Sequence, residues 1–77
     1  MIPKINYIES RDELAVNLKK AREKAGLTQK QASKIVNVER SSLSYYEIGR
    51  CLPSIFTLIK LSMVYNVDLP YLLERKK

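Results

Sequence analysis

Residues 26–49 read GLTQKQASKIVNVERSSLSYYEIG, and this stretch decides the fold because it predicts two short helices separated by a tight turn. Thr28 and Gln31 have the spacing of a capping box, in which each side chain satisfies a backbone N–H at a helix start. The first helix is therefore predicted over 29–36. Asn37 is the next residue that readily adopts left-handed dihedral angles, so it is expected to end this helix and begin the turn.

The second helix of the pair is predicted over 40–48, and Gly49 ends it. Leu43 and Tyr46 recur at helical spacing and form its inward stripe. Its outward face is expected to carry Arg40, Ser41, Ser44 and Tyr45, with Glu39 and Ser42 at the edges. The apolar stripe of the preceding helix is expected to consist of Ala32, Ile35 and Val36.

Three more helices are expected on either side of this pair. Each begins at a capping residue: Ser10 with Glu13, Ser54 after Pro53, and Asp68. They are predicted over about 11–25, from Pro53 to about Tyr65, and over about 69–73, with Gly26 and Asn66 ending the first two. The helix predicted from Pro53 to about Tyr65 is expected to have an inward stripe made of Ile55, Leu58, Ile59, Leu61 and Tyr65. The predicted fold class is all-α with five helices.

The chain has 77 residues, the size of one small domain. Residues 10–73 contain all the predicted helices and form this domain. Residues 1–9 hold Ile2, Ile5, Tyr7 and Ile8 around Pro3. They are an N-terminal arm, and whether it is extended or a short strand stays open. Residues 74–77, ERKK, are a charged tail that is expected to fray.

The composition excludes most classes of enzyme and metal site. The chain has no histidine and one cysteine, Cys51, so it lacks the usual nitrogen and sulfur ligands for zinc or iron. Catalysis by cysteine–histidine or serine–histidine pairs is excluded as well. Two glycines cannot build a glycine-rich phosphate loop. We therefore expect no enzymatic activity, no metal and no cofactor.

The charge favours a polyanionic partner, since the net charge is +6 and the pI is about 9.6. This excess is spread along the chain rather than gathered in one segment. No apolar run is long enough to span a bilayer, and the N-terminus lacks the order of a signal peptide. No membrane partner and a cytoplasmic location are expected.

Two short helices joined by a tight turn, the second presenting polar side chains outward, match the geometry needed to read a DNA major groove. Arginine and serine are among the side chains that read base edges there. The first helix would lie across the sugar–phosphate backbone, where its N-terminal amides and Gln29 can hold a phosphate.

Residues 18–73 resemble the phage-repressor and Cro type of helix-turn-helix domain, often called the XRE family. The resemblance is carried by LKKAREKAGLTQKQASKIVNVERSSLSYYEIGRCLPS at 18–54 and LIKLSMVYNVDLPYLL at 58–73. The matching positions are Arg22, GLTQ at 26–29, SSLS at 41–44, Glu47, Gly49 and Pro53. The resemblance implies a repressor-like fold and a bacterial or phage transcriptional regulator that binds double-stranded DNA sequence-specifically.

The resemblance also implies roles for individual residues. Gln29 matches a glutamine that contacts phosphate and braces the recognition helix, and Arg50 matches a loop position that contacts the backbone. The positions that face bases are matched by Arg40, Ser41 and Tyr45. Flanking positions are matched by Ser44, expected at bases, and Ser42, expected at the backbone. Arg22 and Glu47 match a largely buried ion pair that links the first helix to the recognition helix.

The sequence departs from the family pattern at three places. Ala32 and Ser33 replace a usual leucine–alanine pair, and Asn37 replaces a glycine in the turn, which asparagine tolerates. Glu39 replaces the small hydroxyl residue that caps the recognition helix. Its carboxylate would repel a nearby phosphate, or instead accept from cytosine N4 or favour the helix N-terminus.

The helix that ends near Tyr65 is apolar on more sides than one small domain covers, leaving Phe56, Met63 and Val64 in need of cover. The last helix and the arm provide one explanation. We favour a symmetric homodimer made by the last two helices, with interface residues Phe56, Met63, Leu69, Tyr71 and Leu72. Such a dimer would read a palindromic operator whose half-sites lie roughly 34 Å apart.

Alternatives remain within and outside this class. A restriction–modification controller or an antitoxin of the same fold is one. A protein–protein adaptor that has lost DNA readout is another, supported by Glu39 and by the even charge distribution. An enzyme or a small-ligand receptor is disfavoured by the composition.

Overall fold

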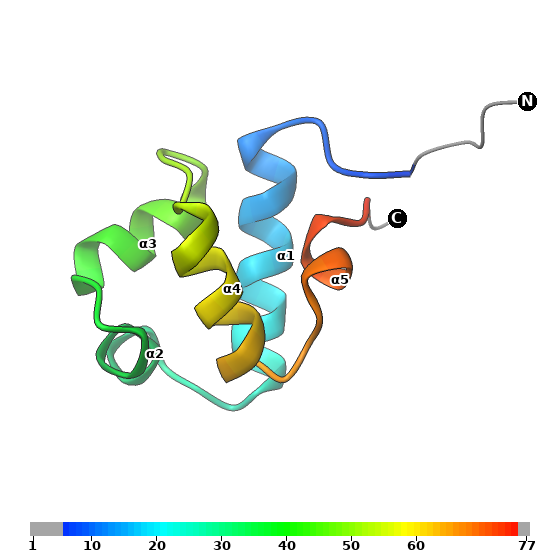
Figure 1. Cartoon of the computed structure of the whole chain (residues 1–77). Helices are drawn as coiled ribbons and strands as arrows, with labels where there is room; N and C mark the ends of the chain where they lie inside the picture. The colour runs from blue at the N-terminus through cyan, green and yellow to red at the C-terminus, as the bar shows by residue number, and fades with distance from the viewer. Residues whose placement is uncertain (1–5, 76–77) are drawn as a thin grey trace, which may run out of the picture.

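The computed structural model describes residues 6–75, which form five helices (Figure 1). They are α1 (Arg11–Lys24), α2 (Gln29–Val36), α3 (Arg40–Ile48), α4 (Ile55–Val64) and α5 (Leu69–Leu73). The predicted all-α class and helix order are confirmed. Among these residues, no helix has both the length and the apolar content that crossing a bilayer requires. The predictions for Ile2, Pro3, Ile5 and the last two lysines lie outside the described residues.

Helix starts are satisfied by nearby side chains. Thr28 and Gln31 form the complete capping box: Thr28 Oγ1 accepts from Gln31 N (3.1 Å), and Gln31 Oε1 accepts from Thr28 N (2.9 Å). The predicted box at Ser10 is only half correct. Ser10 Oγ accepts from Glu13 N (3.3 Å), but the Glu13 carboxylate accepts from Glu9 N (3.1 Å). The second carboxylate oxygen of Glu13 accepts from an arginine of the C-terminal segment at 2.8 Å.

The core lies where the five helices meet. Helix α1 packs against α3 and α5, α2 packs against α3 and α4, and α4 packs against α5. In Figure 1, α1 and α4 occupy the middle, with α2 and α3 on one side and α5 on the other. The core residues are Leu14, Leu18, Ala21, Ala32, Val36, Leu43, Leu58, Leu61, Tyr65 and Leu72. Every helix contributes to this one core, so α3 is held by the whole domain.

Three apolar residues predicted to face inward are exposed. Ile35 of α2 is 58% exposed, and Ile55 and Ile59 of α4 are 51% and 41% exposed. Ser33 and Ser62 occupy buried positions instead, each hydroxyl donating to the carbonyl three residues earlier, at 2.9 and 2.6 Å. These hydroxyls are buried at little cost because they are hydrogen-bonded within their own helices.

The segments before α1 and after α5 pair with each other. Tyr7 and Glu74 form an isolated antiparallel bridge. The flanking hydrogen bonds run from Ile8 N to Leu73 O (2.8 Å) and from Arg75 N to Asn6 O (2.9 Å). The described part of the arm is therefore extended and makes a single strand-like pairing. The expectation that the chain frays after α5 is wrong for Glu74 and Arg75, because this pairing holds them.

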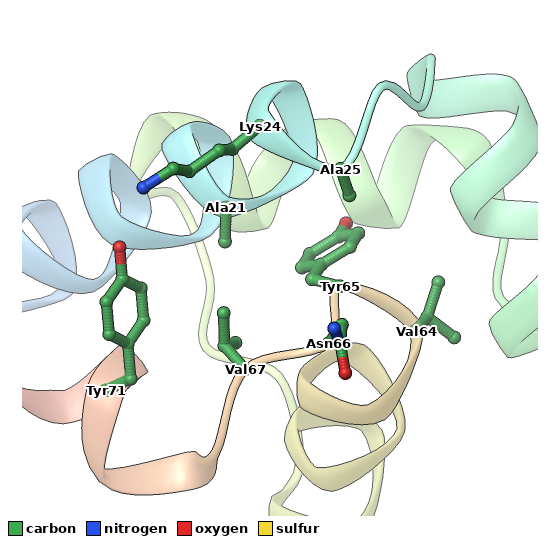
Figure 2. Close-up of a pocket in the computed structure, with 8 residues that line it drawn as sticks. All are labelled: Ala21, Lys24, Ala25, Val64, Tyr65, Asn66, Val67 and Tyr71. Atoms are coloured by element: carbon green, nitrogen blue, oxygen red, sulfur yellow. The ribbon is translucent and has the colours of Figure 1, made fainter.

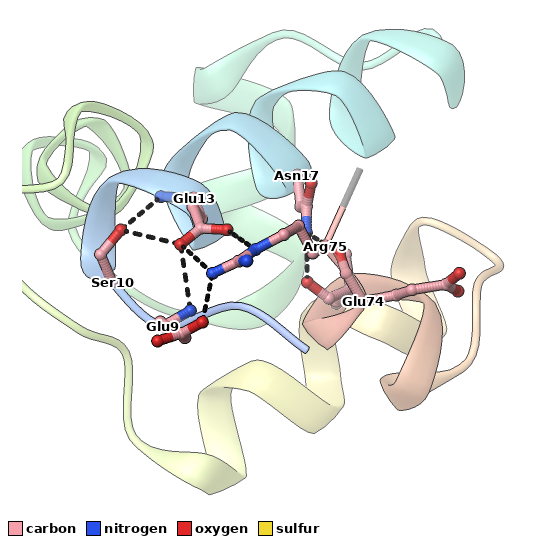
Figure 3. A network of polar contacts seen from close by, with 7 residues as sticks. Glu9, Ser10, Glu13, Asn17, Glu74 and Arg75 are labelled. Carbon is pink, nitrogen blue, oxygen red and sulfur yellow. Dashed lines mark hydrogen bonds and ion pairs between the residues drawn. The ribbon is translucent and has the colours of Figure 1, made fainter. Parts of the chain in front are cut away.

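Side chains of α1, together with Glu9 just before it, bind the C-terminal segment (Figure 3). The Arg75 guanidinium binds Glu9 (Nη2–Oε1, 2.6 Å) and Glu13 (Nε–Oε2, 2.8 Å). The hydrogen bond from Arg75 is the main reason that the pKa of Glu13 lies below its ordinary value. Asn17, only 3% exposed, donates from Nδ2 to the carbonyl oxygens of Leu72 (2.7 Å) and Glu74 (2.9 Å). Nothing in the periodicity of α1 distinguished Asn17 as a residue that holds α5.

Candidate nucleic-acid interface

The outward side of α3 is open to solvent. Leu43 and Glu47 are buried at 1% and 6% exposure, which fixes the rotation of the helix about its axis. The residues predicted to read bases lie on the other sides: Arg40, Ser41 and Tyr45 are exposed, and Ser44 is half-buried. Ser42, predicted to contact the DNA backbone, is half-buried as well. The structure thus brings these five side chains onto one helix. Their contact with DNA stays a prediction.

The turn between α2 and α3 places the two helices. Asn37 has φ 59° and ψ 49°, the left-handed conformation expected at the end of α2. Val38 N then donates to Ser33 O (3.0 Å), which closes the turn. Glu39 occupies the N-cap of α3 but makes no capping hydrogen bond with its side chain. The exposed Glu39 carboxylate therefore acts at the start of α3 only through its charge.

An ion pair between Arg22 of α1 and Glu47 of α3 holds α3 against α1. Arg22 Nε lies 2.7 Å from Glu47 Oε2, and Arg22 Nη2 donates to Glu47 Oε1 at 3.0 Å, so the contact is bidentate. Arg22 Nη1 also donates to Leu27 O (2.7 Å). Hydrogen bonding to Glu47 is the main cause that raises the pKa of Arg22. The pair that the family resemblance implied is present and largely buried.

Gln29 adds a third partner to this pair. Its Nε2 donates to Glu47 Oε1 at 3.1 Å, so the first residue of α2 is tied to the end of α3. The bracing role assigned to Gln29 has this contact as its structural basis. The phosphate contact assigned to Gln29, whose side chain is half-buried, stays a prediction.

Tyr65, the C-cap residue of α4, lies beside the ion pair. Its side chain is 4% exposed, and its hydroxyl has no hydrogen-bond partner among residues 6–75. Burial, followed by the negative charge of Glu47, raises the pKa of this hydroxyl far above its ordinary value, so it is neutral. Figure 2 shows Tyr65 lining a hollow of about 500 Å³ between the end of α1 and the α4–α5 turn.

Besides Arg40, the surface predicted to bind DNA has a second basic residue, Arg50, which lies in the loop after α3. Arg50 N donates to Tyr45 O (3.0 Å), and the Arg50 guanidinium carbon lies 5.3 Å from the centre of the Tyr45 ring. This distance is within the range of a cation–π contact. Arg50 and Tyr45 therefore form one unit, which the sequence alone did not indicate.

Ile48 was missed by the sequence analysis. It is 57% exposed and follows Ser41 and Tyr45 at helical spacing, so it extends their face toward the C-terminal end of α3. The i, i+4, i+7 spacing was available as a signal.

The residues predicted for a dimer interface differ in their exposure to solvent. Phe56 and Met63 are both 75% exposed, and Tyr71 is 36% exposed. Leu69 is half-buried against the core. Leu72 was wrongly assigned, because at 0% exposure its side chain belongs to the core of the monomer. The exposed apolar side of α4, named here the α4 surface, consists of Ile55, Phe56, Ile59 and Met63.

Comparison with known protein families identifies the domain. A family model described as helix-turn-helix matches residues 18–72. The chain belongs to the helix-turn-helix family. The predicted resemblance is thereby confirmed over α2, α3 and α4, together with the second half of α1 and most of α5.

Relatives and solved structures agree with this assignment. This helix-turn-helix chain is 48% identical over 62 residues to the transcriptional regulator ImmR of Bacillus subtilis. The aligned region covers 80% of this chain and 49% of ImmR. It thus spans about half the length of this curated relative. A second relative, YqaE of the same species, is 38% identical over 58 residues and also carries the name of an HTH-type transcriptional regulator. Neither of these relatives is named as an enzyme.

Two solved structures show the same fold. The restriction-modification controller protein C.AhdI from Aeromonas hydrophila superposes with a TM-score of 0.77 at 21% identity, over 82% of this chain and 96% of C.AhdI. The P22 c2 repressor, solved in complex with a synthetic operator, superposes with a TM-score of 0.73 at 25% identity, over 78% of this chain and 91% of the repressor. The predicted repressor-like fold is confirmed.

Proposed function

We propose that this helix-turn-helix domain binds double-stranded DNA with α3 in the major groove. The observation that carries this proposal is the exposed side of α3 bearing Arg40, Ser41 and Tyr45, on a helix whose opposite side is fixed through Glu47. A major groove about 12 Å wide admits one helix. A fixed helix with free polar side chains meets that requirement without any rearrangement of the domain.

The chemistry of each side chain suggests its contact. Arg40 can donate two hydrogen bonds to guanine O6 and N7, which contributes roughly 1–3 kcal/mol of base discrimination. Ser41 and Ser44 offer hydroxyls to base edges, and the Tyr45 ring offers an apolar face to a thymine methyl or a sugar. Gln29, Ser42 and Arg50 are assigned to the sugar–phosphate backbone, which orients the domain but carries no sequence information.

We assign the domain to transcriptional regulation. ImmR and YqaE are named as transcriptional regulators, and the P22 c2 repressor was solved with a synthetic operator. The chain spans about half of ImmR, so the activity of a whole regulator is attributed to this chain only as a proposal. A restriction–modification controller is an alternative role within the fold, and an antitoxin is another.

A homodimer would extend readout to a palindrome. The α4 surface gathers four exposed apolar side chains on one side of a helix, and two of them are 75% exposed. Patches of this kind are characteristic of protein interfaces. A second copy of this chain related by a two-fold axis would cover the α4 surface, with Tyr71 and the exposed part of Leu69 at the edge. Two copies of α3 would then lie roughly 34 Å apart, one turn of DNA.

The dimer is tested by sedimentation of variants. Phe56→Ser and Met63→Ser should each weaken self-association at least tenfold, since both remove large exposed apolar side chains from the α4 surface. Ile35→Ser is the matched control, because Ile35 is 58% exposed but lies on α2. Equal dissociation constants for all three variants would show that α4 does not form the interface.

DNA binding is tested by selecting bound fragments from random duplexes. Arg40→Ala should relax the base preference at one position in each half-site. Arg50→Ala should instead weaken binding to all sequences alike and lower the salt slope by about one. Equal losses on selected and random DNA for Arg40→Ala would remove Arg40 from base readout.

The adaptor function makes the opposite prediction. Glu39 supports it, because its exposed carboxylate stands at the start of α3 without a capping role. Wild-type chain that binds no duplex even at low salt would reject DNA binding and favour the adaptor. Salt-dependent duplex binding would reject the adaptor.

A further inference from the structure

Arg11, the first residue of α1, lies against the loop that follows α3. Its Nη1 donates to Arg50 O at 3.3 Å, across 39 residues of sequence. The next residue, Asp12, contacts the same loop, because a side chain at Gly49 would collide with the Asp12 carboxylate. Figure 1 shows the α3–α4 loop next to the start of α1. The first turn of α1 is thus attached to the edge of the surface assigned to DNA.

The charge of Arg11 is not used within the domain. The guanidinium groups of Arg22 and Arg75 each bind carboxylates, whereas Arg11 makes no ion pair within residues 6–75. A cation in the first turn of a helix is also repelled by the positive end of the helix dipole. Arg11 therefore occupies a position that the stability of α1 disfavours. Arg11 breaks this local rule, and its hydrogen bond to the Arg50 carbonyl leaves its charge without a counterion, which makes it a candidate for function.

The contact with Arg50 places Arg11 next to the proposed reading face. The Arg50 guanidinium extends over the Tyr45 ring of α3, and the Arg50 carbonyl holds Arg11. Two exposed guanidinium groups, one from the loop after α3 and one from the start of α1, therefore lie at the end of α3. Asp12 is the acidic neighbour, and its carboxylate is turned toward the loop at Gly49.

We propose that Arg11 binds a phosphodiester group of the DNA backbone, so that α1 contributes a contact from outside the helix-turn-helix. The proposal rests on the proposed function, since the phosphate is one that flanks the groove occupied by α3. Arg50 positions the Arg11 guanidinium through its carbonyl, and the remaining nitrogen donors of Arg11 face the phosphate. The contact orients the domain and is independent of base sequence.

The experiment compares Arg11→Gln with Lys20→Gln on a random-sequence duplex of about 30 base pairs. Lys20 is exposed on the same helix, about 13 Å along its axis from Arg11, and its replacement changes the net charge equally. Loss of one phosphate contact lowers the salt slope by about 0.9. Arg11→Gln should therefore bind more weakly than wild type by a factor that shrinks roughly 3.5-fold between 50 and 200 mM salt. Arg11→Lys should keep the wild-type slope.

The outcomes separate this proposal from the proposed function. If the wild type binds the duplex and Arg11→Gln has the same salt slope as Lys20→Gln, the role of Arg11 is overturned but the proposed function is not. Absence of wild-type binding at 50 mM salt would overturn both. The melting temperature provides a second readout, because Arg11→Gln removes a cation from a helix start and should not lower it. A lower melting temperature would assign Arg11 to the fold instead.

Discussion

Replacing Glu47 with alanine is expected to remove about 3–5 kcal/mol of stability. The variant leaves Arg22, a residue that is 8% exposed, without its carboxylate partner, and it leaves Gln29 without its acceptor. An unpaired buried charge loses more than the pair contributed, because the charge has neither water nor a counterion. The neutral Tyr65 hydroxyl beside the pair supplies no negative charge in compensation.

This loss is large on the scale of the whole domain. A chain of 77 residues has a total stability of roughly 4–12 kcal/mol at the usual 0.05–0.15 kcal/mol per residue. A loss of 3 kcal/mol lowers the melting temperature by at least about 12 °C in a domain of this size. Glu47→Ala should therefore be partly or wholly unfolded at 37 °C.

Urea unfolding followed by far-ultraviolet circular dichroism measures the effect. Glu23→Ala is the control, since Glu23 is an exposed glutamate on α1. The double variant Arg22→Met with Glu47→Leu should recover most of the lost stability, because neither buried charge remains. A loss below 1 kcal/mol for Glu47→Ala would show that water or a rearranged side chain compensates Arg22, and would refute the reasoning.

Three further predictions concern contacts that hold the domain. Asn17→Ala should reduce stability by about 1–3 kcal/mol in urea unfolding, because two carbonyls around the end of α5 lose their buried donor. Gly49→Ala should be more destabilising than Gly26→Ala: both glycines have positive φ, but an added Cβ meets Asp12 only at Gly49, so equal losses would contradict the steric cause. The pKa of Glu13 is lowered in the folded state from 4.5, so its contribution to stability is present above pH 4.5 and is lost as the pH falls below that value. The difference in unfolding free energy between wild type and Glu13→Gln should therefore shrink from pH 6 to pH 3, and a constant difference would exclude this linkage.

Local sequence was sufficient for the five helices and for their boundaries to within two residues, the largest difference being α4, predicted from Pro53 but beginning at Ile55. The Thr28–Gln31 capping box and the left-handed residues Asn37 and Asn66 involve only residues within a few positions of each other. Such interactions form the same way wherever the helix packs, which is why α2 and α3 begin and end where they were predicted. The family resemblance added the Arg22–Glu47 pair, which spans 25 residues and has no local signal.

Tertiary packing decided which sides of the short helices are buried and which residues surround α3. Helices α2 and α4 bury Ser33 and Ser62 and expose Ile35 and Ile59, because the positions of neighbouring helices override hydrophobicity in a segment of two or three turns. The contact of Arg11 with Arg50 likewise joins residues 39 positions apart. Periodicity describes one helix at a time, whereas burial and long-range contacts depend on where the other helices lie.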